Sequence, residues 1–157
     1  MRRSCLVSAV LLAITAMPAR TQIRATSMLT LDGAKNIAAA AEAEARKNNW
    51  NVSIAIVDAS GGLVFFQKGD NTRPSNVEYS IAKARTSARF QRESRLLDSA
   101  VTAGRIHTLA ADALPIEGGV PIVVNGQVIG AVGVSGATSA QDAQIAKAGI
   151  AGLRLTP

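Results

Sequence analysis

The chain has 157 residues and a formal charge of +6; 48% of the residues are hydrophobic and 18% are charged. This composition is typical of a globular protein rather than a disordered one, and the length suits a single domain. Aromatic residues make up only 3%, which argues against a nucleic-acid partner held on stacked aromatic side chains. We therefore expect one domain whose core is built from alanine and aliphatic residues.

The first 19 residues have the pattern of a secretory signal peptide. Arg2 and Arg3 precede an apolar run from Cys5 to Met17, which is too short to span a bilayer comfortably. Residues 20–28 are polar and are predicted to form a flexible leader before a single domain over 29–157. The sequence thus predicts a periplasmic or secreted protein without a stable membrane anchor.

Removal of this segment would change the chemistry of the mature chain in two ways. Cys5 is the only cysteine, so neither a disulfide nor a thiolate would remain. The formal charge would fall to +4, because 15 of the 17 basic residues remain against 11 acidic ones. A small and dispersed positive excess does not indicate DNA binding.

The rest of the chain alternates between helical and strand patterns. The predicted elements are a helix over 30–48, strands over 52–58 and 63–68, a helix over 76–92, short helical or irregular pieces over 94–114, strands over 120–124 and 127–135, and a helix over 139–153. Strands that come in pairs joined by short turns predict an antiparallel sheet.

The second strand pair carries the strongest local signal. Asn125-Gly126 separates two apolar runs, and both residues tolerate the positive φ of a type I′ hairpin turn. The run from Val128 to Val134 lacks polar alternation, which indicates a strand covered on both faces. We therefore predict a central antiparallel sheet with helices on both faces, an α/β/α sandwich of the α+β class.

Glycines stand at both outer ends of this hairpin, at Gly118-Gly119 and Ser135-Gly136. The turn brings the two ends together. Glycine permits close backbone approach, and exposed N–H groups form nests for anions. The sequence therefore predicts a shared cradle for a ligand that carries a carboxylate; the alternative is that these glycines only form turns.

The second helix carries a basic series that includes Lys83 and Arg85. Arg85, Arg89 and Arg92 follow the spacing that places residues on one helix face. Guanidinium groups bind carboxylates with two parallel hydrogen bonds, so this face is a candidate clamp for the same ligand. A solvent-exposed or subunit-facing surface is the alternative.

Three segments together resemble a known family: VSIAIVDASGGLVFF, IAKARTSARF, and PIEGGVPIVVNGQVIGAVGVSGATSAQDAQIAKAGI. The chain is similar over roughly 29–153 to the GlcG/HbpS family of heme-binding proteins, to which the carboxy-terminal domain of PduO-type proteins also belongs. The resemblance implies a profilin-like, five-stranded antiparallel sheet flanked by helices, homo-oligomers built from dimers, and heme binding or degradation in some members. Lys83 and Arg85 occupy the Lys-Ala-Arg-Thr positions of the family.

His107 is the only histidine and lies in the irregular stretch. Its imidazole is a candidate axial ligand for heme iron, with an ordinary surface histidine as the alternative. Together with Lys83, Arg85, Gly118, Gly119, Ser135 and Gly136 it completes the predicted cofactor-binding set.

Glu117 is the candidate catalytic residue, since a carboxylate beside the Gly118-Gly119 nest has the composition of a general base near an oxyanion site. Glu78 and Tyr79 are further candidates for that pocket. The favoured interpretation is an exported homo-oligomer that binds heme or a related carboxylate-bearing small molecule. The alternatives are a small-molecule lyase or isomerase, and an accessory or sensor module without catalysis.

Overall fold

The computed structural model describes residues 26–154, so the predicted signal peptide and most of the predicted leader lie outside the described residues. The elements in chain order are α1 (Leu31–Lys47), β1 (Ser53–Asp58), β2 (Leu63–Lys68), α2 (Ser75–Phe90), α3 (Ser94–Thr102), the 3₁₀ helix η1 (Ile106–Ala111), β3 (Gly119–Val124), β4 (Gln127–Ser135) and α4 (Ser139–Ala151). The predicted order of helices and strand pairs is confirmed.

The four strands form one antiparallel sheet in the order β2-β1-β4-β3. The five strands that the resemblance implied are wrong for residues 26–154, where the sheet has four. The stretch between α2 and β3 forms α3 and η1 instead. Leu97 and Val101 lie four residues apart in α3, which is the period of a helix, and Leu97 is buried.

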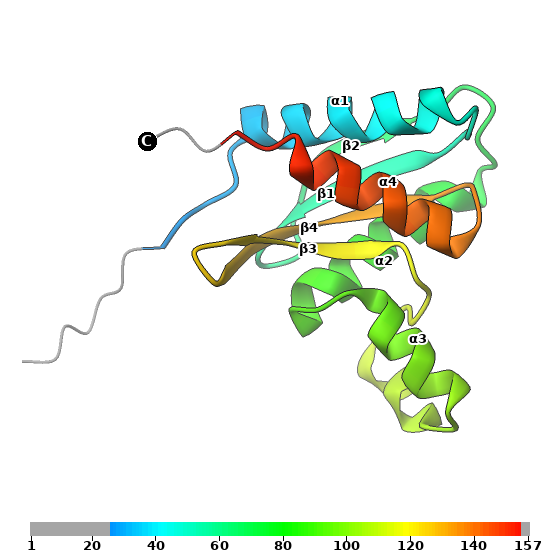
Figure 1. Cartoon of the computed structure of the whole chain (residues 1–157). Coiled ribbons are helices and arrows are strands. Elements are labelled where there is room, and N and C mark those ends of the chain that lie inside the picture. Colours follow the sequence, from blue (N-terminus) through cyan, green and yellow to red (C-terminus); the bar gives the residue numbers. More distant parts are fainter. Residues whose placement is uncertain (1–25, 155–157) are drawn as a thin grey trace, which may run out of the picture.

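Helices cover both faces of the sheet, as predicted (Figure 1). Helices α1 and α4 lie side by side on one face, and α2 crosses the other face over β4 and β1. Strand β4 is central and is buried from Ile129 to Ser135, which explains its lack of polar alternation. Helix α3 and η1 project away from the sheet beyond α2 (Figure 1).

Both predicted turns form. Asn125 and Gly126 have φ values of 50° and 75°, the positive pair that a type I′ hairpin requires. The β1–β2 turn is held by Asp58, whose Oδ1 accepts hydrogen bonds from the backbone N–H of Ser60 at 2.8 Å and of Gly62 at 2.9 Å.

Alanines and isoleucines form the core, as the composition indicated. Under α1 and α4, fully buried Ile37, Ile56 and Ile145 pack with alanines from both helices. On the α2 side, Ala84 and Ala88 rest on β1 and β4. The small side chains of Ala84 and Ala88 let α2 lie close to the sheet. The longer side chains of α2 therefore lie at the end of the sheet, as Lys83 does, or on the outer face of the helix, as Arg85 does.

Candidate functional site

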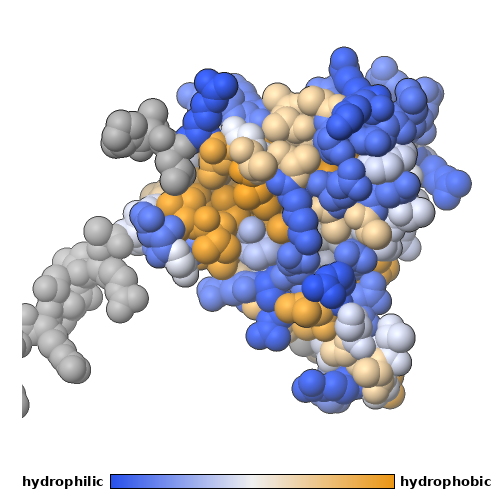
Figure 2. Space-filling model, viewed as in Figure 1, coloured by the Kyte–Doolittle hydropathy of each residue, from blue (hydrophilic) through white to orange (hydrophobic). Residues whose placement is uncertain are grey.

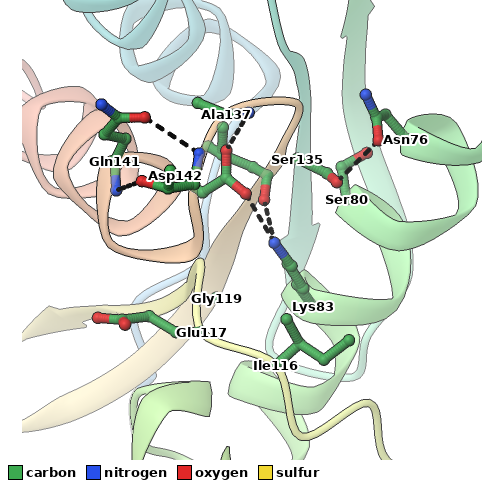
Figure 3. A network of polar contacts seen from close by, with 12 residues as sticks. Asn76, Ser80, Lys83, Ile116, Glu117, Gly119, Ser135, Ala137, Gln141 and Asp142 are labelled. Carbon is green, nitrogen blue, oxygen red and sulfur yellow. Dashed lines mark hydrogen bonds and ion pairs between the residues drawn. The ribbon is translucent and has the colours of Figure 1, made fainter. Parts of the chain in front are cut away.

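Lys83 is buried between the two layers of helices rather than exposed. Its side chain leaves α2 at the end of β4, where Nζ donates to Asp142 Oδ2 at 2.8 Å and to the Val134 carbonyl at 3.1 Å (Figure 3). Asp142 on α4 also accepts from the Ala137 N–H at 3.0 Å. Burial raises the pKa of the Asp142 carboxyl, against the opposing effect of Lys83.

Gly118 and Gly119 lie directly against this lysine. A Cβ on Gly119 would stand 2.3 Å from the Lys83 carbonyl oxygen, and one on Gly118 would stand 2.9 Å from Lys83 Nζ. The Gly119 N–H already donates to Ser94 Oγ at 2.9 Å. The bare backbone therefore lets α2 approach the start of β3, and the contacts of the chain itself fill the space between them.

Ser135 and Gly136, at the other end of the hairpin, have different neighbours from Gly118 and Gly119. Ser135 is buried, and its Oγ donates to Asn76 Oδ1 at 3.3 Å. Gly136 is exposed with φ at 150°, and a Cβ there would stand 2.2 Å from the Asn51 carbonyl oxygen. Gly136 lines a polar hollow beside Asn51, whereas Gly118 and Gly119 face α2.

Glu117 lies in a surface network of charges. Its N–H donates to Asp98 Oδ2 at 3.1 Å, and its carboxylate lies 4.0 Å from Arg95 Nε. Arg95 also lies 3.7 Å from Glu93, which pairs with Lys147 at 3.1 Å. These charges link α3, α4 and the segment before β3. None of these residues lines the cleft on α2 that is described next.

A cleft with a volume of about 860 Å³ lies on the outer side of α2. Its other walls are the β1–β2 turn and the segment that includes the end of η1 and runs to Leu114. Its lining is mainly polar, with apolar side chains contributed by Ile81, Leu109 and Leu114, and Arg85 and Arg89 stand one helical turn apart along α2.

The two arginines are held loosely by the cleft walls. Arg85 Nε donates to the Gly61 carbonyl at 3.2 Å, and Arg89 Nη1 lies 3.2 Å from Asp112 Oδ2. The side chains of Arg89 and Asp112 are 59% and 97% exposed, so solvent weakens this ion pair and a ligand could replace it.

Of the predicted cofactor-binding set, Arg85 alone lines this cleft, and Arg89 of the predicted basic face lines it as well. Glu78, a weaker candidate, lines it too, and Tyr79 beside it is 45% exposed. His107 is exposed on η1, two residues before Leu109. Within residues 26–154, no three His, Cys, Asp or Glu side chains gather in a way that could hold a metal ion.

Sequence reasoning missed the wall formed by Leu109, Asp112 and Leu114. The stretch over 94–114 forms short pieces broken at Gly104, so the position of its far end against α2 could not be predicted from the sequence. The one available signal was the i, i+4 spacing of Arg85 and Arg89, which had marked this face of α2 as a clamp.

Comparison with known proteins places these features in a family. The family model described as "Haem degrading protein HbpS-like" matches residues 29–151. Protein GlcG of Escherichia coli K12 is 48% identical over 109 residues, which cover 69% of this chain and 81% of GlcG. Within the described residues, no helix is both long enough and apolar enough to cross a membrane.

Two solved structures share the fold. A double mutant of HbpS from Streptomyces reticuli has a TM-score of 0.78 and 28% identity over 91% of this chain and 99% of its own. PduOC, solved as a heme complex, has a TM-score of 0.74 and 24% identity over 80% of this chain and 95% of its own.

Proposed function

The chain belongs to the HbpS-like family, and from this premise we propose that it binds heme in the cleft on the outer side of α2. The family description names heme as the molecule on which HbpS-like proteins act. PduOC, which has the same fold, was solved in complex with heme. These relatives support the choice of ligand, and the geometry of this chain supports the choice of site.

The observation that carries the proposal is that two guanidinium groups and three apolar side chains, Ile81, Leu109 and Leu114, line one cleft. Ligand pockets usually have volumes of about 300–1,000 Å³ with apolar walls and a few polar groups, and this cleft of about 860 Å³ lies within that range. Heme has the matching chemistry, a broad apolar ring with two carboxylates on one edge.

Each group of the cleft has a role in this proposal. Arg85 and Arg89 bind the two carboxylates through charge-assisted hydrogen bonds. Ile81, Leu109 and Leu114 exclude water from the faces of the ring. Bound heme supplies an iron centre for ligand exchange and electron transfer, with properties set by axial ligands and local polarity.

The remaining predicted residues receive different roles. His107 is the proposed iron ligand, because η1 also supplies Leu109 to the cleft wall. Lys83, Gly118 and Gly119 set the position of α2, and thereby of Arg85, without touching the ligand. Ser135, Gly136 and Glu117 lie outside the proposed heme site.

We further propose that the protein is exported and forms a homo-oligomer. The pattern of the first 19 residues supports export. Apolar side chains gather over the β3–β4 hairpin on the face seen in Figure 2, and Val123 on β3 is 52% exposed. Burial of this area against a second copy would remove it from water. Light scattering of the mature chain at micromolar concentration tests this point, and a monomer mass would contradict it.

Titration of the mature protein with hemin tests the main proposal. We expect a saturable shift of the Soret band at a fixed stoichiometry. Arg85→Ala and Arg89→Ala should each weaken binding by about tenfold, which is the loss of one charge-assisted contact. Arg46→Ala is the matched control, since Arg46 is exposed on α1 at the opposite face of the sheet.

Two outcomes would refute this site. A Soret shift that is identical in both cleft variants would place the heme elsewhere. A titration without saturation would remove heme as the ligand.

A further inference from the structure

Trp50 is the only tryptophan of the chain. It lines two surface hollows that are separate from the α2 cleft. The hollows have volumes of about 530 and 390 Å³. Both are lined by Trp50, Asn51 and Asn71, and neither shares a lining residue with the α2 cleft. Trp50 is partly buried against the core, and it also lines both hollows.

The larger hollow is built from three loops at one end of the sheet, on the right in Figure 1. They are the α1–β1 loop, the β2–α2 loop and the β4–α4 loop. Each loop or the helix turn that follows it brings side-chain amides. The five amide residues are Asn49, Asn51, Asn71, Asn76 and Gln141.

Several of these amides are free to meet a ligand. Asn76 accepts a hydrogen bond from Ser135, and Gln141 caps α4. The side chains of Asn49, Asn51 and Asn71 make no hydrogen bond to any other residue within 26–154. A side-chain amide offers two donors and an acceptor with two lone pairs, so three of them together present many directed hydrogen-bonding positions on one surface.

Charge is sparse in the larger hollow and balanced in the smaller one. Arg73 is the only charged residue that lines the larger hollow. The smaller hollow contains two acids and two bases: Glu42, Asp70, Arg46 and Lys68. A ligand of high charge would therefore find little electrostatic attraction across the two hollows, whereas a neutral ligand rich in hydroxyl groups would find a partner for each hydroxyl.

We propose that this surface binds a carbohydrate chain, with Trp50 between two adjacent sugar positions. Hydroxyl groups both donate and accept, as side-chain amides do. An indole face covers the C–H face of a sugar ring and adds contact area at little entropic cost. The two hollows on either side of one aromatic residue suit linked sugars better than a single ring.

Fluorescence of the heme-free mature protein tests this inference, since Trp50 is the only indole in the chain. The probes are chitotetraose, maltotetraose, tetragalacturonate and a neutral Gly-Ser octapeptide. We expect saturable changes in emission with at least one neutral tetrasaccharide and none with the peptide. The matching monosaccharide should bind at least tenfold more weakly, because it occupies one hollow only.

Variants separate specific binding from a surface effect. Asn71→Ala should weaken the tetrasaccharide about tenfold by calorimetry, since Asn71 lines both hollows. Asn36→Ala, an exposed amide on α1 outside both hollows, should bind as the unmodified protein does. Hemin binding should be unchanged in both variants.

Three outcomes would overturn the inference. One is that no tetrasaccharide changes the emission at up to about 10 mM, a very weak affinity for a biological ligand. Another is equal affinity for the unmodified protein and Asn71→Ala. The third is binding of the peptide or of tetragalacturonate alone, which would assign the surface to a peptide or an acidic ligand.

Discussion

Lys83 Nζ and Asp142 Oδ2 lie 2.8 Å apart, although their helices cover opposite faces of the sheet. The side chains of Lys83 and Asp142 are only 4% and 2% exposed. Their contact passes the end of β4, where Lys83 also binds the Val134 carbonyl. The pair therefore ties α2 and α4 to the same point of the sheet and fixes the helix that carries Arg85.

Removal of one member of this pair should destabilise the fold strongly. Lys83→Met leaves the Asp142 carboxylate buried without its partner, which costs about 3–5 kcal/mol in unfolding free energy. The double variant Lys83→Met with Asp142→Leu should recover most of that loss, because no buried charge remains. Urea unfolding followed by circular dichroism measures both values.

The exposed pair Arg89–Asp112 provides the control. Asp112→Asn removes the charge and keeps a residue type that tolerates the φ of 49° at this position, so it should change the unfolding free energy by about 0–1 kcal/mol, the range of surface ion pairs. A Lys83→Met variant as stable as this control would show that the buried pair contributes nothing to the fold.

The carboxyls of Asp142 and Asp58 should contribute with opposite sign to the pH dependence of the unfolding free energy. Burial raises the pKa of Asp142 above its ordinary value of 3.8. The folded chain then binds more protons at this carboxyl than the unfolded chain does. The contribution of Asp142 is fully present below the unfolded pKa and is lost as pH rises through the folded pKa.

Asp58 should show the opposite sign. The hydrogen bond from the Ser60 side chain lowers the pKa of Asp58, so its contribution is present above the unfolded pKa and lost as pH falls through the folded pKa. Unfolding free energies from about pH 3 to 7 for Asp142→Asn, Asp58→Asn and the unmodified protein measure both slopes. Equal slopes for the two variants would contradict the assignment.

Gly119→Ala should move α2 away from β3. The new Cβ would stand 2.3 Å from the backbone oxygen of Lys83, and backbone yields less than a flexible side chain. We expect a loss of about 1–3 kcal/mol in unfolding free energy, as for other overpacked positions. Hemin affinity should fall with it, because Arg85 is carried by the same helix.

Gly126→Asn is the control for this glycine. Gly126 has φ at 75°, a conformation that Asn tolerates, and its missing Cβ would meet no atom within 4 Å. Unfolding near the unmodified value is expected for Gly126→Asn. A Gly119→Ala variant of unchanged stability would show that the close approach is not essential.

Local patterns made most of the fold predictable. Asn125-Gly126 predicted the hairpin because its turn depends on two adjacent residues, and the unbroken apolar run of β4 predicted a central strand. The fifth strand came from the family resemblance rather than from a pattern in these residues, and the sheet within residues 26–154 has four strands.

The candidate site was less predictable because its contacts are distant in sequence. Lys83 was assigned to the ligand since nothing in its neighbourhood along the chain shows that Asp142, 59 positions away, is its partner. Likewise, the N–H of Leu114 donates to Thr86 Oγ1 and so holds Leu114 at the α2 cleft. Helices α3 and η1 separate these two residues along the sequence. Arg85 was predicted from its match to the Lys-Ala-Arg-Thr positions of the family, and its spacing from Arg89 placed both on one helix face.

His107→Ala should change the optical spectrum of bound hemin more than its affinity. Arg85, Arg89 and the apolar walls remain in this variant, so the hemin should still bind. Loss of an imidazole ligand alters the iron environment and moves the visible bands. Added free imidazole should restore the original spectrum, a rescue that a merely structural histidine would not show.

We expect export of the protein to depend on residues 1–19. A basic start followed by a short apolar run is removed when a signal peptidase acts on it. Intact-mass spectrometry of protein from the secreting host should give an N-terminus near residues 17–22. Replacement of Leu11 and Leu12 with aspartate would interrupt the apolar run and should retain the full-length chain inside the cell. The control is the same pair of replacements at Thr26 and Ser27, after the predicted cleavage point, which should leave export intact. A mature protein that still begins with Met1 outside the cell would contradict the signal peptide.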